Sequence, residues 1–571
     1  MKKYNIFYCL SAVLLASASC TDWNDHYQVP TTDAGNGTTI WQALCNTPEL
    51  SNFKEAVFYC GYDVTLDGAQ MYSVFAPDNN SFTAEKLDSV KNVYKQDKVQ
   101  GIKDKENRAV TEFIQNHIAL YNTTVDAVNG STSRILNMLN GKNKELTSTT
   151  FSGVNLSNVN GRQQNGVLYT MEGIAAYEPN IYEYMTTRQD LDSIRSFIYN
   201  PNYNVEVFSP SESVPGDIID GKTHYLDSVT YVRNELFNYW LRARLTSEDS
   251  VYLMVMPNNN VWKEKLEQIS NYYVYEKTAQ NRDSFAYFFP RWNIISGTVF
   301  SKKVNPDDQI QDTAFSTNGV KFRDRYPTYV LSEKAGDEGT SVRYSYEKKF
   351  YQYDKPFAAG GIFNGTEEQK VSNGMVYIAN KWNFPDERKF LREIVMEAES
   401  SSTIDSVDEK STAVPYEISL SEQEPAYDKV GGHKLMMISP LSTGQSKTFL
   451  TVDNVLSNVK YDAYIVLNSY SGMPTSIQAT VSYYDSEKGT GTEKRVSFAK
   501  TGTMMTSGIL YQNDTIHIGQ YEFPYCTYDL SENSHKVKIL LETNVQQAEV
   551  SAGLKTKTIF LDCVIFKPRK D

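Results

Sequence analysis

The stretch Tyr72-Ser73-Val74-Phe75-Ala76-Pro77-Asp78-Asn79-Asn80-Ser81-Phe82 decides how the first half of this chain is expected to fold. Its apolar beginning predicts a short buried strand. Proline, aspartate and asparagine then predict a turn, and Asn79, Asn80 and Ser81 are residue types that cap the N-terminus of a helix. We therefore expect a strand that runs directly into a helix opened by Phe82.

Two further motifs follow this stretch in order. Residues 113–118, Phe-Ile-Gln-Asn-His-Ile, indicate a helix that leads into a strand, and residues 165–174, Asn-Gly-Val-Leu-Tyr-Thr-Met-Glu-Gly-Ile, indicate a closing strand. Together the three motifs resemble the signatures of fasciclin domains. The resemblance implies an α+β domain over residues 38–180, with His117 at a position that often carries a structural histidine in that family.

The three motifs recur in weaker form further along the chain. The matching residues are 252–262, 288–295 and 371–378. In the second of these ranges Asn293 stands in place of His117. We expect a second, divergent fasciclin-like domain over residues 181–388, with a long insertion around residues 305–361. The insertion is either a recognition loop or a tolerated excursion.

Strand signals replace helical spacing from Phe390 onward. Apolar or alternating runs recur at 394–399, 448–452, 461–467, 477–484, 535–542 and 558–566. Such short, closely spaced strands predict a β-sandwich. The opening Met-Glu-Ala-Glu and the closing Phe-Leu-Asp resemble galactose-binding-like jelly rolls, including some carbohydrate-binding modules. The expected fold class is therefore multidomain α+β and all-β, with two fasciclin-like α+β domains followed by a jelly-roll β-sandwich over residues 389–571.

The N-terminal segment is typical of exported proteins. Lys2 and Lys3 precede an uncharged, apolar run over residues 4–18 that is too short for a transmembrane helix. The small residues before Cys20 resemble a bacterial lipobox, although that motif usually has a larger aliphatic residue where Ser17 stands. An ordinary signal peptide with a chance cysteine is the alternative.

The lipobox resemblance carries further implications. It implies a signal peptide over residues 1–19, lipidation of Cys20 and a polar tether over residues 20–37. Asp22 and Asp25 resemble the acidic start of surface lipoproteins of the Bacteroidota. That resemblance implies a lipid-anchored protein of the outer membrane that faces the cell exterior.

Composition narrows the choice of partner. The formal net charge is −13, which argues against nucleic acid because phosphate binding needs clustered Lys and Arg. The 40 tyrosines suit sugar or peptide contacts, but they equally suit half-buried strands. Cys45 and Cys60 either form a disulfide or remain buried free thiols, and the absence of a paired C-x-x-C argues against a zinc site.

No catalytic motif stands out, so we expect a protein that is not an enzyme. In the jelly rolls that the C-terminal part resembles, acidic residues of the first and last strands hold a structural Ca²⁺. Glu397, Glu399 and Asp562 occupy comparable positions. The alternative is a set of solvated or hydrogen-bonded carboxylates at a strand edge. No other cofactor is expected.

Two further groups of residues are candidate sites. Because no Trp follows Trp382, a sugar platform in the sandwich would use tyrosines such as Tyr483, Tyr484, Tyr525 and Tyr528. A repeated Asp-(Ser/Thr)-aliphatic pattern resembles the O-glycosylation signal of exported Bacteroidota proteins. The hydroxyl residues of this pattern are Ser89, Ser193, Ser228, Ser250, Thr313, Ser406 and Thr515.

Three functions are compatible with these features. The first is a non-catalytic surface lipoprotein that binds a polysaccharide or peptide, beside a nutrient importer of the starch-utilisation (SusC/SusD) type that similar lipoproteins accompany. The second is fasciclin-type cell adhesion. The third is an enzyme whose site the sequence does not reveal. We favour the first because the anchor, the fasciclin copies and the sandwich occur together without a catalytic motif.

Overall fold

The computed structural model describes residues 37–569, except 126–132, 212, 220–221, 228–229, 242, 302–328, 332–340, 347–348, 355–358 and 409–412. These residues form two compact units. The first contains the chain up to Asn180 together with Ser247–Asp249 and Val371–Asn373, and the second contains the remainder. Among the described residues, no helix combines the length and apolar character needed to cross a bilayer.

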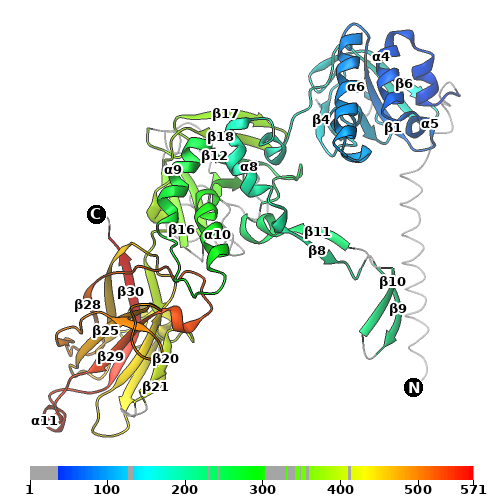
Figure 1. The fold of residues 1–571 in the computed structure, drawn as a ribbon. Helices are drawn as coiled ribbons and strands as arrows, with labels where there is room; N and C mark the ends of the chain where they lie inside the picture. Colours follow the sequence, from blue (N-terminus) through cyan, green and yellow to red (C-terminus); the bar gives the residue numbers. More distant parts are fainter. Residues whose placement is uncertain are drawn as a thin grey trace, which may run out of the picture. The chain divides into compact units, whose positions relative to one another are not determined.

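The first unit is an α+β fold around one mixed sheet (Figure 1). Its helices are α3 (Ile40–Cys45), α4 (Ser51–Tyr59), α5 (Asp63–Asp67) and α6 (Ala84–Val99), with helical turns η1 (Pro48–Leu50), η2 (Asp104–Glu106), η3 (Ala109–Ile114) and η4 (Gln115–His117). Its strands are β1 (Tyr72–Pro77), β2 (Ile118–Leu120), β3 (Arg134–Asn137), β4 (Asn143–Leu146), β5 (Thr150–Phe151), β6 (Val154–Gln163) and β7 (Gly166–Met171). The sheet order is β2-β1-β7-β6-β5-β4-β3.

The decisive strand β1 is buried along its whole length. Its alternating side chains face two cores. Val74 and Ala76 pack with residues of α3, α4 and η3, while Phe75 stacks on Phe151 and Tyr169 on the other face. The apolar run is therefore a strand, as predicted, and it contributes to the cores on both faces of the sheet.

The turn after β1 differs from the sequence expectation. The helix begins at Ala84 with Thr83 as its N-cap, so Asn79, Asn80 and Ser81 do not cap it. The side chain of Asn79 instead donates to the Pro48 carbonyl and accepts from the Asn52 amide. The Asn79 side chain, which was expected to cap the following helix, thus makes a tertiary contact to the preceding helical segments instead.

His117 is a buried structural residue. Its Nδ1 lies 2.8 Å from the Phe113 carbonyl, and its Nε2 accepts from the Ala175 amide at 3.2 Å. Burial lowers the pKa of His117 to about 4, so the ring is neutral at pH 7. The histidine therefore joins the end of η4 to the segment that follows β7.

The second unit begins with another α+β fold. Its helices and helical turns are α7 (Ile181–Tyr184), η6 (Gln189–Leu191), α8 (Asp192–Ile198), η7 (Pro201–Tyr203), η8 (Leu236–Leu241), α9 (Asn259–Ser270), α10 (Arg282–Ile295) and η10 (Asp386–Arg388). Its strands are β8 (Asn204–Phe208), β9 (Val214–Ile219), β10 (Lys222–Asp227), β11 (Thr230–Asn234), β12 (Tyr252–Pro257), β13 (Val299–Ser301), β14 (Tyr329–Leu331), β15 (Ser341–Tyr346), β16 (Lys349–Asp354), β17 (Thr366–Val371) and β18 (Gly374–Ala379). The main sheet order is β16-β15-β14-β13-β12-β18-β17.

The two α+β folds repeat one strand register. Tyr72 pairs with Gly166 in the parallel β1–β7 ladder, and Tyr252 pairs with Gly374 in the parallel β12–β18 ladder. In both copies a short antiparallel strand, β2 or β13, lies on the other side of the central strand. The predicted duplication is therefore present in the sheet topology.

One part of the second copy differs from the prediction. Residues 288–295 were expected to include the start of a strand, but α10 continues to Ile295 and the strand starts at Val299. Asn293 nevertheless donates to the Phe289 carbonyl, four residues earlier, as His117 contacts Phe113. The predicted insertion contributes strands β14, β15 and β16 to the main sheet. These three strands lengthen the sheet beyond β13.

The C-terminal part is a sandwich of two antiparallel sheets. Its strands are β19 (Ile394–Glu397), β20 (Ile404–Val407), β21 (Ala413–Ser419), β22 (Lys434–Pro440), β23 (Lys447–Val452), β24 (Lys460–Asn468), β25 (Ser476–Tyr484), β26 (Arg495–Ser497), β27 (Met504–Met505), β28 (Asn513–Glu522), β29 (Val537–Thr543) and β30 (Ile559–Pro568). Its short helical elements are η11 (Tyr427–Lys429), η12 (Gly431–His433), η13 (Asn533–His535) and α11 (Gln547–Ser551). One sheet has the order β21-β22-β30-β24-β28 with β19 beside β30, and the other β20-β23-β29-β25-β26 with β27 beside β25.

The segment after α9, residues 271–281, packs on the sandwich within the second unit. The buried Glu276 accepts hydrogen bonds from Ser486 and Thr278. The Cys526 amide donates to the Val274 carbonyl at 2.6 Å. These contacts connect the second α+β fold to the sandwich.

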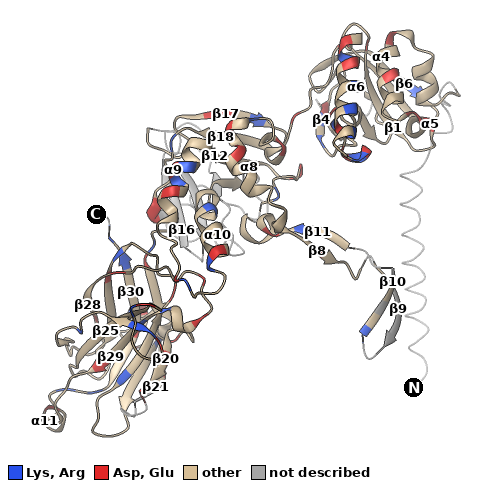
Figure 2. Cartoon of the chain, viewed as in Figure 1, with Lys and Arg blue, Asp and Glu red and all other residues tan. Residues whose placement is uncertain are grey.

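Charged residues of both signs alternate on the helix surfaces. Figure 2 shows acidic and basic residues interspersed on helices α6 and α9.

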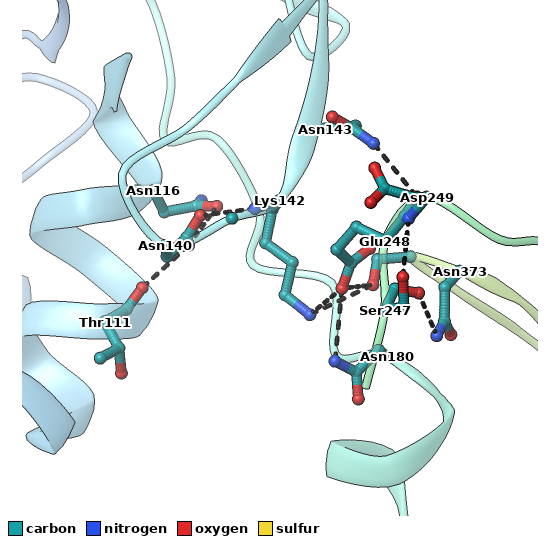
Figure 3. A network of polar contacts seen from close by, with 12 residues as sticks. Thr111, Asn116, Asn140, Lys142, Asn143, Asn180, Ser247, Glu248, Asp249 and Asn373 are labelled. Atoms are coloured by element: carbon teal, nitrogen blue, oxygen red, sulfur yellow. Dashed lines mark hydrogen bonds and ion pairs between the residues drawn. The ribbon is translucent and has the colours of Figure 1, made fainter. Parts of the chain in front are cut away.

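A buried ion pair organises the first unit (Figure 3). Lys142 Nζ lies 2.6 Å from Glu248 Oε1, with only 2% and 10% of the two side chains exposed. The same carboxylate oxygen accepts from Ser372 and Asn180, at 3.0 and 3.3 Å. The ammonium also lies 5.4 Å from the centre of the Tyr177 ring. Desolvated charges of this kind need such a complete set of partners.

Candidate ligand-binding face and cation cluster

The outer face of the sheet that contains β24 and β28 carries a group of polar and aromatic side chains. Asp462 is opposite Gln520, and Tyr464 is opposite His517, across the antiparallel β24–β28 ladder. Asp462 and Tyr464 are alternate residues of β24, so their side chains point to one face. An irregularity in the register of the ladder between them lets His517 and Gln520, which are three residues apart on β28, lie opposite these two residues. We call Asp462, Tyr464, His517 and Gln520 the outer strip.

The side chains of the outer strip interact with one another. Gln520 Nε2 donates to Asp462 Oδ1 at 3.0 Å, and His517 Nε2 lies 3.3 Å from the same oxygen. The rings of Tyr464 and His517 are 5.1 Å apart. The His517 side chain remains 47% exposed. The strip therefore combines a fixed hydrogen-bonding group with a partly open aromatic pair.

A cavity adjoins the outer strip at the free edge of β28. Its volume is about 470 Å³. The wall of β28 includes His517, Gln520 and Tyr521, and the facing wall includes Phe498 and Met504. Because His517 and Gln520 belong to both features, the strip and the cavity form one continuous surface. The hollow is shallow and wide open to solvent, so it suits an extended ligand that lies along the surface better than one that is enclosed.

The three acidic residues predicted to hold a cation lie near one another. Both glutamates were expected on the first strand of the sandwich, but Glu397 ends β19 and Glu399 lies in the turn after it. Burial, together with the charges of Glu397 and Glu399, raises the pKa of Asp562 to about 6. The carboxylate of Asp562 accepts from the Gly431 amide at 3.1 Å and from Asn513 at 3.3 Å.

Cys563 adds a sulfur atom to this group, which the sequence analysis did not foresee. Its Sγ and one carboxylate oxygen each from Glu397 and Asp562 all lie within 4.8 Å of one another. Cys563 is 7% exposed, and burial beside acidic groups raises the pKa of its thiol. A cysteine within an otherwise apolar strand gave no signal in the sequence, because its proximity to Glu397 arises only from the β19–β30 pairing.

The four tyrosines named as a sugar platform do not form one group on the sandwich. The ring of Tyr528 packs on Tyr273 and Phe289, and Tyr484 packs on His535. Tyr483 packs on Phe498, and Tyr525 is half-buried. Their role in ligand binding stays a prediction. The sequence does not indicate the outer strip, because Asp462 and Gln520 are 58 positions apart and come together only through the pairing of β24 with β28.

The remaining sequence candidates are distributed as follows. Cys45 and Cys60 are free thiols, so the structure contains no disulfide between them. Ser89, Ser406 and Thr515 are exposed, and Ser193 and Ser250 are half-buried. Cys20, the signal peptide and the tether up to residue 36 lie outside the described residues, as do Ser228 and Thr313. Lipidation and glycosylation therefore stay predictions.

The observed sheets define a multidomain protein that combines two related α+β folds with an all-β sandwich. A FAS1 domain pair from the insect cell adhesion molecule fasciclin I is similar at 10% identity and a TM-score of 0.20, over 60% of this chain and 98% of that chain. No family model and no curated protein sequence matches the chain.

Solved carbohydrate-binding domains are similar to about a third of this chain. The CBM22-1 xylan-binding domain of Paenibacillus barcinonensis Xyn10C is 11% identical, with a TM-score of 0.20, over 32% of this chain and 95% of that chain. The CBM22-1–GH10 modules of a Clostridium thermocellum endo-1,4-beta-D-xylanase, complexed with xylohexaose, are 16% identical, with a TM-score of 0.20, over 32% of this chain and 29% of that chain.

Proposed function

We propose that this protein is a non-catalytic lipoprotein of the outer-membrane surface that binds a glycan through its sandwich. The observation that carries the proposal is the continuous surface formed by the outer strip and the adjoining cavity. The chemistry of that surface supports a glycan as the ligand. The N-terminal sequence supports a lipid anchor that holds the protein at the membrane.

The outer strip and cavity offer the two kinds of contact that sugars need. The Tyr464 ring and the Phe498 side chain supply apolar surface for the C–H face of a sugar ring. Asp462, His517 and Gln520 supply hydrogen-bond acceptors and donors for sugar hydroxyls. Because these polar groups are already held by one another, little conformational entropy is lost when a ligand binds.

Affinity electrophoresis tests this proposal. The full chain is run in native gels that contain one polysaccharide each, and at least one polysaccharide should retard it. We expect Tyr464→Ala and His517→Ala to lower the affinity by about tenfold or more, because each removes a contact of roughly 1.4 kcal/mol or more. Tyr416→Ala is the matched control, since Tyr416 is an exposed tyrosine of the sandwich outside the outer strip.

The gel experiment has clear contrary outcomes. Retardation by no polysaccharide would contradict glycan binding. Equal loss in Tyr416→Ala would contradict the outer strip as the site. Release of reducing sugar from a retarding polysaccharide by the pure protein would contradict a non-catalytic role.

The membrane anchor and the importer are further parts of the proposal. The lipobox-like residues before Cys20 and the acidic residues after it support lipidation and display on the cell surface. In the native host, fatty-acid label should enter the parent protein and be absent from Cys20→Ser, and protease added to whole cells should cleave the parent. Label in Cys20→Ser would contradict the anchor. Isolation of the native protein without a SusC/SusD-type importer would contradict that partner.

A further inference from the structure

The cluster of Glu397, Asp562 and Cys563 differs from the calcium site that the sequence resemblance implied. Calcium takes oxygen ligands and does not select sulfur. Here Cys563 Sγ lies within 4.8 Å of a carboxylate oxygen of both Glu397 and Asp562. The donor set therefore contains one soft atom as well as hard oxygens.

Local backbone features bring these three side chains together. Val466 pairs with Cys563 and its neighbour Leu467 pairs with Leu561, so Asp562 is an extra residue in β30. Such a bulge places two consecutive residues opposite one partner residue and re-aims a side chain. Glu397 is the direct partner of Cys563 in the adjacent ladder. Two consecutive residues of β30 thus reach the same group as Glu397.

The loop that faces the cluster leaves room only for glycine. A Cβ on Gly431 would lie 2.3 Å from Glu397 Oε2, and a Cβ on Gly432 would lie 2.2 Å from Glu399 Oε1. The Gly431 amide donates to Asp562. The loop therefore lies against the carboxylates, of which Asp562 is buried and Glu397 and Glu399 are partly buried, and this desolvation makes an uncompensated group of negative charges costly.

A second observation points to a ligand for this cluster. Cys563 is 93% buried, and its thiol has no hydrogen-bond partner among the residues that the structure describes. The Oε2 atom of Glu399 is also buried without a hydrogen bond in the described part of the chain. A thiol is a weak hydrogen-bond donor, so its position beside two carboxylates adds little stability by itself. As a thiolate, the same group is a strong ligand for a thiophilic cation.

We propose that Glu397, Asp562 and Cys563 bind a thiophilic divalent cation of the Zn²⁺ class, rather than calcium. The thiol loses its proton to solvent as the sulfur–metal bond forms, and the two carboxylates supply oxygen ligands. A fourth position is left for water or Glu399. The cation would join β19 to β30 and hold the Gly431 loop against both.

The test uses Zn²⁺, Ca²⁺ and Co²⁺ with the purified full chain after metal removal. Isothermal titration should show one Zn²⁺ per chain, with Ca²⁺ at least tenfold weaker. Co²⁺ should produce a thiolate-to-cobalt charge-transfer band that is absent from Cys563→Ser. Glu397→Gln should weaken Zn²⁺ binding by about tenfold or more, and Cys526→Ser, which removes a buried thiol elsewhere, should retain the band.

One measurement keeps the proposal testable if a variant does not fold. X-ray absorption at the zinc edge of the parent chain, loaded with one equivalent, should show one sulfur neighbour at about 2.3 Å. Oxygen neighbours alone, tighter binding of Ca²⁺ than of Zn²⁺, a charge-transfer band that persists in Cys563→Ser, or binding of no cation would each overturn the proposal.

Discussion

Two buried polar residues join backbone segments around β1 in the first α+β fold. Asn165 accepts from the Ile40 amide and donates to the Leu66 and Gly68 carbonyls, so one buried side chain joins three backbone segments. His117 has a comparable role on the other side of β1. Both were visible in the sequence because each stands beside a predicted strand.

His117 should make the first unit less stable in mild acid. Its pKa is about 4 in the folded chain and about 6.5 in an unfolded one. The unfolded state therefore binds the proton first, so the stabilising contribution is complete above pH 6.5 and is lost as the pH falls toward 4. Between pH 7.5 and pH 5 we expect a loss of about 2 kcal/mol from this group.

Urea unfolding at several pH values, monitored by hydrogen exchange of the β7 amides, measures the free energy of unfolding of the first unit. In His117→Gln the pH dependence over this range should become flatter, even though the variant is less stable overall. An unchanged pH dependence in His117→Gln would show that other groups are responsible.

Residue chemistry also marks the limit of prediction from sequence. Glu397, Glu399 and Asp562 were selected from a resemblance, and the structure places them near one another. Cys563 could not be selected, because only the bulge in β30 and its pairing with β19 bring the thiol to the carboxylates. A bulge depends on strand register, which no local pattern in residues 559–568 determines.

At the level of elements, the sequence predicts central strands better than boundaries. The runs at 72–77 and 252–257 are buried strands in both copies, because their length and apolar character fit no exposed element. The apolar residues Ile294 and Ile295 belong to α10 instead of a strand. A short apolar run cannot distinguish a buried helix end from a strand, so the periodicity was ambiguous there.

The parallel ladder between β12 and β18 should tolerate no side chain at Gly374. A Cβ on Gly374 would lie 1.8 Å from the Tyr252 carbonyl oxygen, and its φ is +144°. Gly374→Ala should therefore lower the free energy of unfolding of the second unit by at least about 2 kcal/mol, because the central ladder must shift. Urea denaturation of the full chain measures the change.

Gly502→Ala is the control for this substitution. No atom lies within 4 Å of a Cβ at Gly502, so we expect a change of less than about 0.5 kcal/mol. If Gly374→Ala were as stable as Gly502→Ala, the close approach of β18 to β12 would not be essential to the sheet.

For the whole molecule, the order of folds followed from the sequence but the ligand surface did not. Motif order and the change at Phe390 predicted α+β folds followed by a sandwich. The tyrosines Tyr483, Tyr484, Tyr525 and Tyr528 were chosen by residue type, and the structure uses one of them, Tyr528, in packing with the second α+β fold. The outer strip depends on the pairing of β24 with β28, which composition alone cannot indicate.

The central claim is that the outer strip and its adjoining cavity bind a glycan. The most direct test is hydrogen–deuterium exchange of the full chain, with and without an oligosaccharide prepared from the polysaccharide that retards it. We predict slower exchange in β24 and β28 and around residues 498–504, and little change elsewhere in the sandwich. Protection confined to other strands, or no protection at saturating oligosaccharide, would contradict the claim.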